Sequence, residues 1–434
     1  MLNKYLFSRN YIEIGHKLFL GGVFLLPSAF PLGSLLLLIS LIISFFQSEK
    51  NIFKDKWNIP FFISFFLILV NTFFITFIST PEELVNYPKS LIWVSLFNWL
   101  PILYGFWGFQ NYLNTDNKRN KFIRYLIYGS IPFILSCIFQ LFGIYGPFST
   151  MWGLIIWFQR IPAGGISGLF SNSNYASFWL SINLPFALFL LKSNDKFIKK
   201  IVLLLIISLI TSFIILSNSR NGILGMIFVF LAIYGFKKMS ILAILGSIFA
   251  ITLDLILNLI NSDFSISNWI SSNPHTSISR LINLDFDLIS SSRFRIWGSA
   301  IELIKKKPIL GWGSSTFPYL NQYESTNVDN FINAQHTHSM PLELAHNFGI
   351  PLSLLIVCTI FTLMIKGIKN LKEKKYIFKN YLLNKTWLIS CLLVLASHSN
   401  DITYYDGKIS LLICILFSGL NVSQIHKIIS LIIF

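Results

Sequence analysis

The sequence predicts an all-α polytopic membrane protein with about twelve transmembrane helices and one large outer loop. Three observations lead to this fold class. Of the 434 residues, 54% are hydrophobic and only 12% are charged, which is about half the charge of an average soluble domain. Apolar runs near the bilayer-spanning length of roughly 20 residues recur along the chain. One long polar segment, residues 261–339, interrupts these runs.

The apolar runs divide the chain into three parts. We expect nine helices with short loops over residues 1–260, the outer loop over 261–339, and three helices over 340–434. The first two runs meet at Pro31-Leu32-Gly33, which predicts a tight hairpin, and no small-residue cleavage site follows the first, so we expect no removable signal peptide. The predicted spans are residues 17–30, 32–46, 59–78, 90–110, 122–145, 174–191, 198–216, 221–236, 240–259, 340–365, 386–399 and 408–425.

The distribution of basic residues predicts the orientation. With the N-terminus in the cytoplasm, 24 of the 34 lysines and arginines fall on inner segments, most densely over residues 366–385. Such a bias marks the cytoplasmic side of a membrane protein. We therefore expect a polytopic membrane protein with both termini cytoplasmic and its large loop on the outer face of the membrane. The net charge of +16 then reflects topology and contact with lipid headgroups, so no nucleic-acid partner is expected.

Part of the outer loop predicts an amphipathic helix. Residues 293–307 follow three serines that can cap a helix and precede Pro308, which would end it. We expect this helix to lie along the membrane surface with Arg293 at its start. Its predicted apolar face comprises Phe294, Trp297, Ala300, Ile301 and Ile304.

Three arginines are candidates for binding an anion at the outer face. Arg220 lies in a very short turn between two spans, where an arginine either snorkels to the headgroups or has an anionic partner. Arg293 and Arg295 begin the amphipathic helix, and we expect one to face the site and the other water. Two solvated charges are an equal alternative. Arginine suits a diphosphate because its planar fork binds two oxygens and stays charged.

His336 and His338 precede the span predicted at 340–365 and allow three interpretations. A metal site would need a third ligand from Asp329, Glu343 or His346, at no recognised spacing. A pair of solvated loop histidines is the simplest alternative. The third is a general base at the membrane boundary, since histidine titrates near neutral pH. Glu343 and His346 would then orient it or, more simply, line the helix end. No phosphate-binding or dinucleotide motif occurs, so no cofactor or metal is expected.

At four places, in order, the sequence resembles the O-antigen ligase and O-antigen polymerase superfamily of bacterial envelope glycosyltransferases. Residues 168–174 (GLFSNSN) and 219–222 (SRNG) resemble its entrance to a middle span and its serine-arginine-glycine turn. Arg293, Trp297 and residues 308–313 (PILGWG) resemble its arginine, tryptophan and P-x-L-G-x-G signature. His336 and His338 resemble its histidine motif. The family's following asparagine is Ser339 here, so either histidine could be the equivalent, and we favour His338.

The resemblance implies a metal-independent transferase without cofactors. Such proteins move a glycan from a polyprenyl diphosphate, such as undecaprenyl diphosphate, to an acceptor hydroxyl, which is another lipid-linked glycan, a lipid core or a protein. Arg220 and Arg293, with Arg295 as a secondary candidate, would stabilise the departing diphosphate. His338, or His336, would activate the acceptor hydroxyl. The spans would hold the polyprenyl tail, and membrane lipids would surround them.

Two other functions compete with this one. A multi-span transporter of a small anion, such as bicarbonate, would place polar groups near the bilayer midplane, often with internal repeats. The candidate residues gather instead in outer segments, and no convincing repeat is present. A non-catalytic assembly protein would use its loop arginines for lipid headgroups. The transferase hypothesis makes a spatial prediction: Arg220, Arg293 and His338 converge at the outer boundary.

Overall fold

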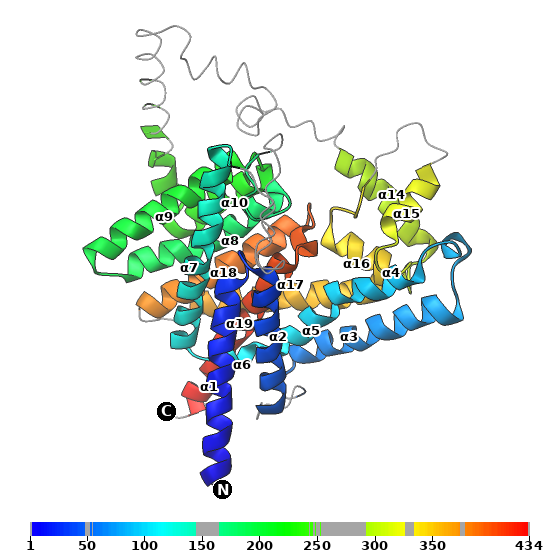
Figure 1. Ribbon diagram of the computed structural model, residues 1–434, viewed down its shortest axis with the longest axis horizontal. Coiled ribbons are helices and arrows are strands. Elements are labelled where there is room, and N and C mark those ends of the chain that lie inside the picture. Colours follow the sequence, from blue (N-terminus) through cyan, green and yellow to red (C-terminus); the bar gives the residue numbers. More distant parts are fainter. Residues whose placement is uncertain are drawn as a thin grey trace. The chain divides into compact units, whose positions relative to one another are not determined.

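The structure is a computed structural model of the chain. It describes residues 2–47, 53, 55–144, 165–242, 244–245, 248, 252, 292–325, 334–373 and 378–432, and the secondary structure of these residues is helical, without strands. The prediction of an all-α protein is thus confirmed for them. The chain forms two compact units (Figure 1). Unit 1 comprises residues 1–132, 149–156 and 289–434, and unit 2 comprises residues 133–148 and 157–288. Each is considered by itself below.

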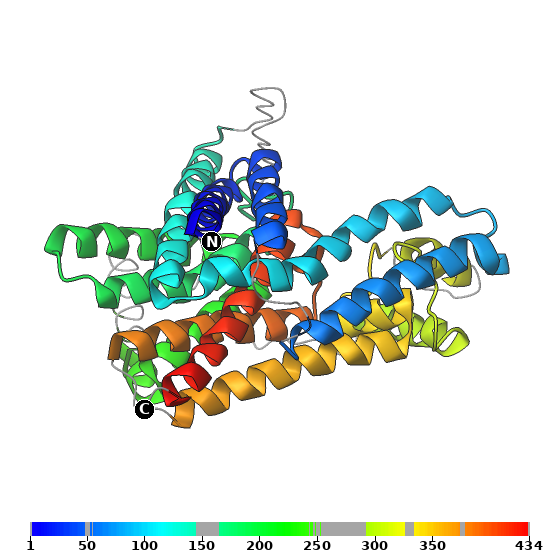
Figure 2. The same cartoon turned by 90° about the horizontal axis from the view of Figure 1, so that it is seen from below.

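Unit 1 carries most of the helices. Helix α17 packs against α3, α16, α18 and α19, and Figure 2 shows it alongside α3. Its N-terminal part consists of α1 Leu2–Leu25, α2 Phe30–Gln47, α3 Asn58–Phe73 with a π-helical end Phe74–Ile78, a 3-10 turn Glu82–Leu84, α4 Lys89–Val94 with a 3-10 turn Ser95–Asn98, α5 Leu100–Gly108, α6 Gln110–Leu113 and the first part of α7 Asp116–Leu141. Its C-terminal part consists of α14 Ser292–Lys306, α15 Phe317–Ser325, α16 Met340–Phe348, α17 Ile350–Glu373, α18 Phe378–His398, a 3-10 turn Thr403–Tyr405 and α19 Gly407–Ile432.

The hairpin predicted at the N-terminus is present, with its turn earlier than expected. Helices α1 and α2 pack closely, and the chain turns between Leu25 and Phe30. Gly33 lies inside α2, where a side chain would meet the backbone of Leu26 at 2.9 Å. The glycine therefore allows two helices to approach each other and does not form the turn itself.

The described part of unit 2 includes the end of α7 and three long helices. These are α8 Ser173–Ser193, α9 Phe197–Leu216 and α10 Arg220–Tyr234, and α8 packs against both α9 and α10. Nearly every described residue from Ala176 to Leu190 of α8 is buried. Helix α8 is thus the centre of this unit.

Six described helices are long and apolar enough to cross a membrane, which agrees with the prediction of a membrane protein. Five of them coincide with predicted spans, namely Asn58–Ile78, Lys89–Gly108, Asp116–Leu141, Ser173–Ser193 and Phe197–Leu216. The apolar helices Phe30–Phe46, Arg220–Tyr234 and Gly407–Ser423 are shorter. Most of the span predicted at 240–259 and residues 261–291 of the outer loop lie outside the described residues. The total of twelve stays a prediction.

The sixth spanning helix begins later than the sequence predicts. The apolar run at 340–365 is not one helix, because Gly349 ends α16 with a φ of 87° and α17 begins at Ile350. The candidate span is Ile350–Lys372. This break separates a short helix that follows the histidines from the helix that can cross the membrane.

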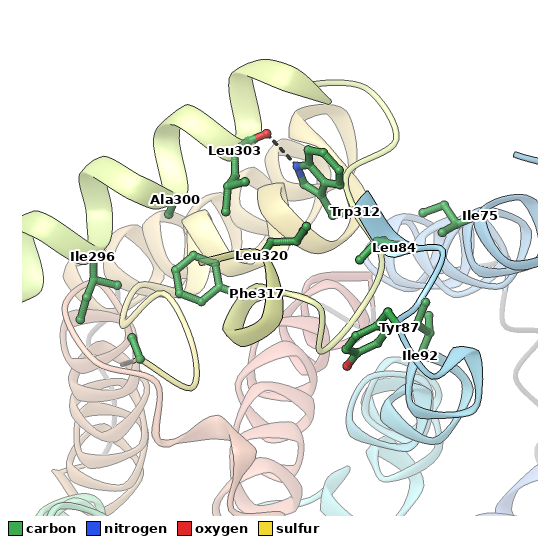
Figure 3. Packing of buried hydrophobic residues seen from close by; sticks show 11 residues of the cluster. Ile75, Leu84, Tyr87, Ile92, Ile296, Ala300, Leu303, Trp312, Phe317 and Leu320 are labelled. Carbon is green, nitrogen blue, oxygen red and sulfur yellow. Dashed lines mark hydrogen bonds between the residues drawn. The ribbon is translucent and has the colours of Figure 1, made fainter. Parts of the chain in front are cut away.

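The predicted amphipathic helix is present as α14, one residue earlier at each end. Its inward face differs from the prediction. Ile296, Ala300 and Leu303 enter a buried cluster with Trp312 and Phe317, shown in Figure 3, while Phe294 and Ile301 are exposed. The helix thus has two apolar stripes. The stripe of Ile296, Ala300 and Leu303 faces the protein, and the stripe of Phe294 and Ile301 is exposed.

Candidate active site

The central contact joins a predicted histidine to an aspartate that the motifs do not include. The Nδ1 atom of His338 lies 3.1 Å from Oδ1 of Asp401. Asp401 follows the end of α18, is buried, and also accepts the backbone N–H of Ile402 at 2.9 Å. A carboxylate only accepts hydrogen bonds, so the proton of a neutral His338 sits on Nδ1. Its Nε2 atom then carries the lone pair that a general base needs.

Arg293 approaches the same carboxylate from α14. Its Nη2 atom lies 3.5 Å from Oδ2 of Asp401, the oxygen that His338 does not contact. About a third of the Arg293 side chain is exposed (32%). A guanidinium has five N–H donors, so this ion pair leaves donors available for another anion. Arg295, two residues along, is exposed.

Burial and its neighbours determine the charge of Asp401. Burial alone would raise the pKa of its carboxyl group, but the hydrogen bond with His338 and the charge of Arg293 outweigh that effect and lower the pKa below its usual value. The group is therefore ionised at neutral pH. An ionised Asp401 can fix the ring of His338, and it is placed to stabilise positive charge on that ring.

The signature at residues 308–313 holds α14 beside α16. The backbone N–H groups of Trp312 and Gly313 donate to the carbonyls of His346 and Asn347, at 2.8 and 2.9 Å. The indole N–H of Trp312 donates to the carbonyl of Leu303 in α14, at 2.8 Å (Figure 3). Through these bonds the helix that starts with Arg293 is fixed to the helix that follows His338.

Two glycines make that backbone approach possible. Gly311 has a φ of 68°, and an added Cβ would lie 2.6 Å from the carbonyl oxygen of His346. At Gly349 an added Cβ would overlap the carbonyl oxygen of Ile309. Any larger residue would push the two segments apart. Gly311 and Gly349 therefore help to keep Arg293 and His338 in their positions.

The histidine segment is held in an uncommon conformation. His338 has a φ of 53°, in the left-handed region that residues other than glycine rarely adopt. The ring of His336 lies 4.3 Å from that of His338 between centroids, and stacks on Tyr405 at 5.8 Å. Such backbone strain persists only where surrounding contacts hold it, and it occurs often at functional sites.

Glu343 and His346 do not orient His338 by direct contact, as one interpretation of the sequence had it. The Glu343 carboxylate accepts the backbone N–H of Thr337 at 2.9 Å and the hydroxyl of Tyr405. The His346 ring is buried against Phe317 and shares a hydrogen bond with Asn347. Asp401 orients His338 instead. Asp329, a possible metal ligand in the sequence, lies outside the described residues, and the described residues contain no group of three His, Cys, Asp or Glu able to hold a metal ion.

An apolar cavity of about 270 Å³ lies in unit 1 next to these loops. Its lining includes Met340 and Pro341, which follow the histidine segment, and Ser399 and Tyr404, which flank Asp401. Phe61, Phe106, Ile356, Phe361 and Phe417 line it farther along α3, α5, α17 and α19. The polar site and an apolar chamber thus share two loops.

Arg220 belongs to unit 2, as the first residue of α10. Ser219 caps this helix by accepting the N–H of Gly222 at 3.3 Å. Arg220 is exposed, and the N–H groups and positive dipole end of a helix N-terminus also attract anions. Its convergence with Arg293 and His338 stays a prediction.

Within unit 2, the segments directly before two of the four sequence motifs meet. The backbone N–H of Ile166 donates to the carbonyl of Leu216 at 3.0 Å, and Gly165, with a φ of 101°, packs on the carbonyl of Ser217. The segment that leads into α8 therefore supports the turn that carries Arg220.

Asp401 and Tyr405 are the site residues that sequence reasoning missed. Both lie in the short polar stretch of residues 397–406, between the runs at 386–399 and 408–425. An ionisable residue at a membrane boundary is costly and is usually functional. That argument could have identified Asp401 as a candidate, although nothing in the sequence links it to His338.

Comparison with known families agrees with three of the four motifs, those at residues 219–222, 293–313 and 336–338. Residues 176–357, from α8 to α17, match the family model described as O-antigen ligase. The match includes Arg220, Arg293, His336 and His338 and ends before Asp401. No curated protein gives a significant match to the chain. The family implies a glycosyltransferase-like enzyme with lipid-linked glycan and acceptor substrates, and does not support the transporter alternative. This match supports the resemblance of residues 176–357 to the O-antigen ligase and polymerase superfamily.

Proposed function

We propose that this protein transfers a glycan from a polyprenyl diphosphate carrier to an acceptor hydroxyl at the periplasmic face of the bacterial inner membrane. The observation that carries the proposal is the contact of His338 and Arg293 with opposite oxygens of the buried Asp401. The family match gives the class of donor and acceptor in general terms. The undecaprenyl carrier, the cellular location and the independence from metal ions are parts of the proposal.

The proposed step is a direct displacement. The acceptor oxygen forms a bond to the anomeric carbon, the bond from that carbon to the phosphate oxygen breaks, and its electron pair leaves with the diphosphate. His338 takes the acceptor proton on Nε2 while Asp401 stabilises the resulting imidazolium. One displacement inverts the configuration at the anomeric carbon. The diphosphate is already an activated leaving group, so the step requires no nucleotide.

The arginines would stabilise the charge that develops on the departing diphosphate. Arg293 has the better support, because its charge is already fixed beside Asp401 and a third of its side chain is exposed. Arg220 would add a second positive charge at a helix N-terminus. Arg295 is exposed on α14 and is the weaker candidate. His336, whose ring contacts His338, remains the alternative base.

The apolar cavity fits the isoprenoid end of the donor. Its lining residues come mainly from α16, α18 and α19, which adjoin the site loops, and from α3, α5 and α17, and most of them are aliphatic or aromatic. A polyprenyl chain inserted there would gain roughly 25 cal/mol for each Å² of apolar surface removed from water. Its diphosphate would then lie near the loops that carry His338 and Asp401.

An acceptor-swap assay tests this function and separates ligase from polymerase. The full chain in lipid nanodiscs receives one polyprenyl diphosphate-linked oligosaccharide and, in parallel reactions, a lipid-core acceptor, a protein acceptor or more of the same donor. A single addition to the core or protein indicates a ligase, and a ladder of longer lipid-linked glycans indicates a polymerase. We expect transfer to persist after treatment with EDTA. If no acceptor receives glycan, or transfer requires an added metal ion, the proposal is wrong in that part.

A further inference from the structure

The buried carboxylate of Glu343 bridges two loops. The side chain is 1% exposed, and three groups donate hydrogen bonds to it. Its Oε2 atom accepts the backbone N–H of Thr337 at 2.9 Å. Its Oε1 atom accepts the amide of Asn347 at 3.3 Å and the hydroxyl of Tyr405. Thr337 stands between His336 and His338, and Tyr405 belongs to the loop of Asp401.

We propose that Glu343 is a positioning residue. Through Thr337 and Tyr405 it keeps His338 within hydrogen-bond distance of Asp401. The inference deepens the proposed function and rests on it. Outside α16, the hydrogen bonds of the Glu343 carboxylate go to Thr337 and Tyr405, so its effect on the pair passes through the two loops.

The surroundings of the two loops explain why such a bridge is needed. His338 has a φ of 53°, a strained backbone conformation that its neighbours must maintain. The hydrogen bond to Thr337 fixes the residue directly before it. On the other side the Tyr405 ring stacks on His336 at 5.8 Å and packs edge-on against Trp99 at 6.2 Å. The bridge thus has one end on each side of the His338–Asp401 contact.

The chemistry of the three donors requires a carboxylate. An ionised glutamate only accepts hydrogen bonds, so both of its oxygens suit N–H and O–H donors. Glutamine has the same shape, but its NH₂ group would face either the N–H of Thr337 or the amide N–H of Asn347, so at least one of the three hydrogen bonds is lost whichever way the amide is turned. Burial and the neighbouring Glu343 raise the pKa of Tyr405 well above its usual value, so its hydroxyl keeps the proton that it donates. Glu343→Gln therefore weakens the bridge with little change in volume.

The direct test follows the ring of His338 by NMR. The full chain in nanodiscs carries ¹⁵N-labelled histidine, and the His338 signals are assigned by their loss in His338→Gln. At mildly alkaline pH the nitrogen shifts show which ring atom holds the proton. We expect the proton mainly on Nδ1 in the native chain, and a shift toward the Nε2-protonated form in Asp401→Asn, Glu343→Gln and Tyr405→Phe. This readout needs no glycan substrate, so it decides the positioning role even if the proposed function fails.

Two substitutions serve as matched controls. Glu302→Gln makes the same change on an exposed carboxylate of α14, which pairs with Lys305. Tyr87→Phe removes another phenol hydroxyl of unit 1, one that donates to the carbonyl of Ser315 at 2.8 Å. Neither should alter the His338 signals. Thermal unfolding is recorded for each variant, and Tyr405→Phe keeps the test available if Glu343→Gln does not fold.

Turnover provides the second readout once a transfer assay is in hand. Glu343→Gln should lower kcat about 10²-fold, the scale on which a misplacement of about 1 Å acts, with KM for the donor little changed. In an Asp401→Asn background, Glu343→Gln should lower kcat hardly any further, because the His338–Asp401 contact that Glu343 supports is already lost. The positioning role is overturned if Glu343→Gln and Tyr405→Phe fold and leave the Nδ1-protonated form intact, or if the two losses in kcat simply multiply.

Discussion

His338 is hydrogen-bonded to Asp401, 63 residues farther along the chain, through Nδ1 at 3.1 Å. Arg293 pairs with the other oxygen of the same carboxylate at 3.5 Å. Three elements that are far apart in the sequence thus meet at the buried carboxylate of Asp401. They are α14, the segment before α16 and the loop after α18. The chemistry assigned to the protein depends on this meeting point.

Replacing Asp401 with asparagine should lower the rate of glycan transfer by roughly 10²- to 10⁴-fold, the contribution typical of general acid–base catalysis. Asparagine no longer fixes the proton of His338 on Nδ1 by charge, and it cannot stabilise an imidazolium. Single-turnover transfer with a lipid-linked donor measures the loss. Glu302→Gln, on an exposed carboxylate, serves as the control. A rate for Asp401→Asn within twofold of the native rate would remove Asp401 from the mechanism.

Arg293→Ala should slow transfer by about 10²- to 10³-fold, the cost of losing one preorganised group that stabilises charge in a transition state. Arg295→Ala, on the same helix but exposed, should cost less than tenfold. Arg293→Lys keeps the charge but lacks the planar fork, so its loss in transfer rate should fall between the losses of the two alanine variants. Equal losses for Arg293→Ala and Arg295→Ala would contradict the assignment of the diphosphate to Arg293.

Gly349→Ala should strongly destabilise unit 1. The residue has a φ of 87°, and a Cβ atom would overlap the carbonyl oxygen of Ile309. Gly298 in α14 is the matched control, because a Cβ there meets no atom within 4 Å. Gly298→Ala should stabilise the helix by about 0.5–1 kcal/mol. Apparent Tm values in detergent compare the two, and a Gly349→Ala protein as stable as the native chain would show that the close approach is not required.

The folded protein should lose stability in mild acid partly through His336. Burial lowers the pKa of His336 below its usual 6.5, His338 and Arg293 lower it further, and Glu343 and Asp401 oppose the change. Between the lowered pKa and 6.5 the unfolded chain binds more protons than the folded chain, so stability falls as the pH falls through that window. His336→Gln should reduce the difference in Tm between pH 7.5 and 5. It should not abolish that difference, because other groups also titrate between these pH values. An unchanged difference would contradict the lowered pKa.

Much of the fold follows from the sequence because its causes are local. Apolar runs near the bilayer length predict five of the six spanning helices closely, and serines with Pro308 predict α14 to within one residue at each end. The inward face of α14 was predicted in part: Ala300 and Ile304 are buried as expected, whereas Phe294 and Ile301 are exposed. Phe294 and Ile301 form one apolar stripe and Ile296 and Leu303 another, and periodicity does not tell which of them meets the core.

The site was predictable where the motifs carry it. The motifs led to His338 and Arg293, and both lie at the Asp401 carboxylate. Asp401 and Tyr405 could not be found in this way, because their roles come from tertiary contacts with segments 60 or more residues away. The break at Gly349 was missed for a similar reason. A side chain at Gly349 would overlap the backbone of Ile309 on another segment, and hydropathy does not record such a contact.

The comparison of two histidine variants tests the central claim most directly. Purified native chain, His338→Ala and His336→Ala receive the same polyprenyl diphosphate-linked oligosaccharide and the acceptor found by the swap assay. We expect rapid transfer by the native chain, a loss of at least about 10²-fold in His338→Ala, and a smaller loss in His336→Ala. Full transfer activity in a folded His338→Ala protein would contradict the account.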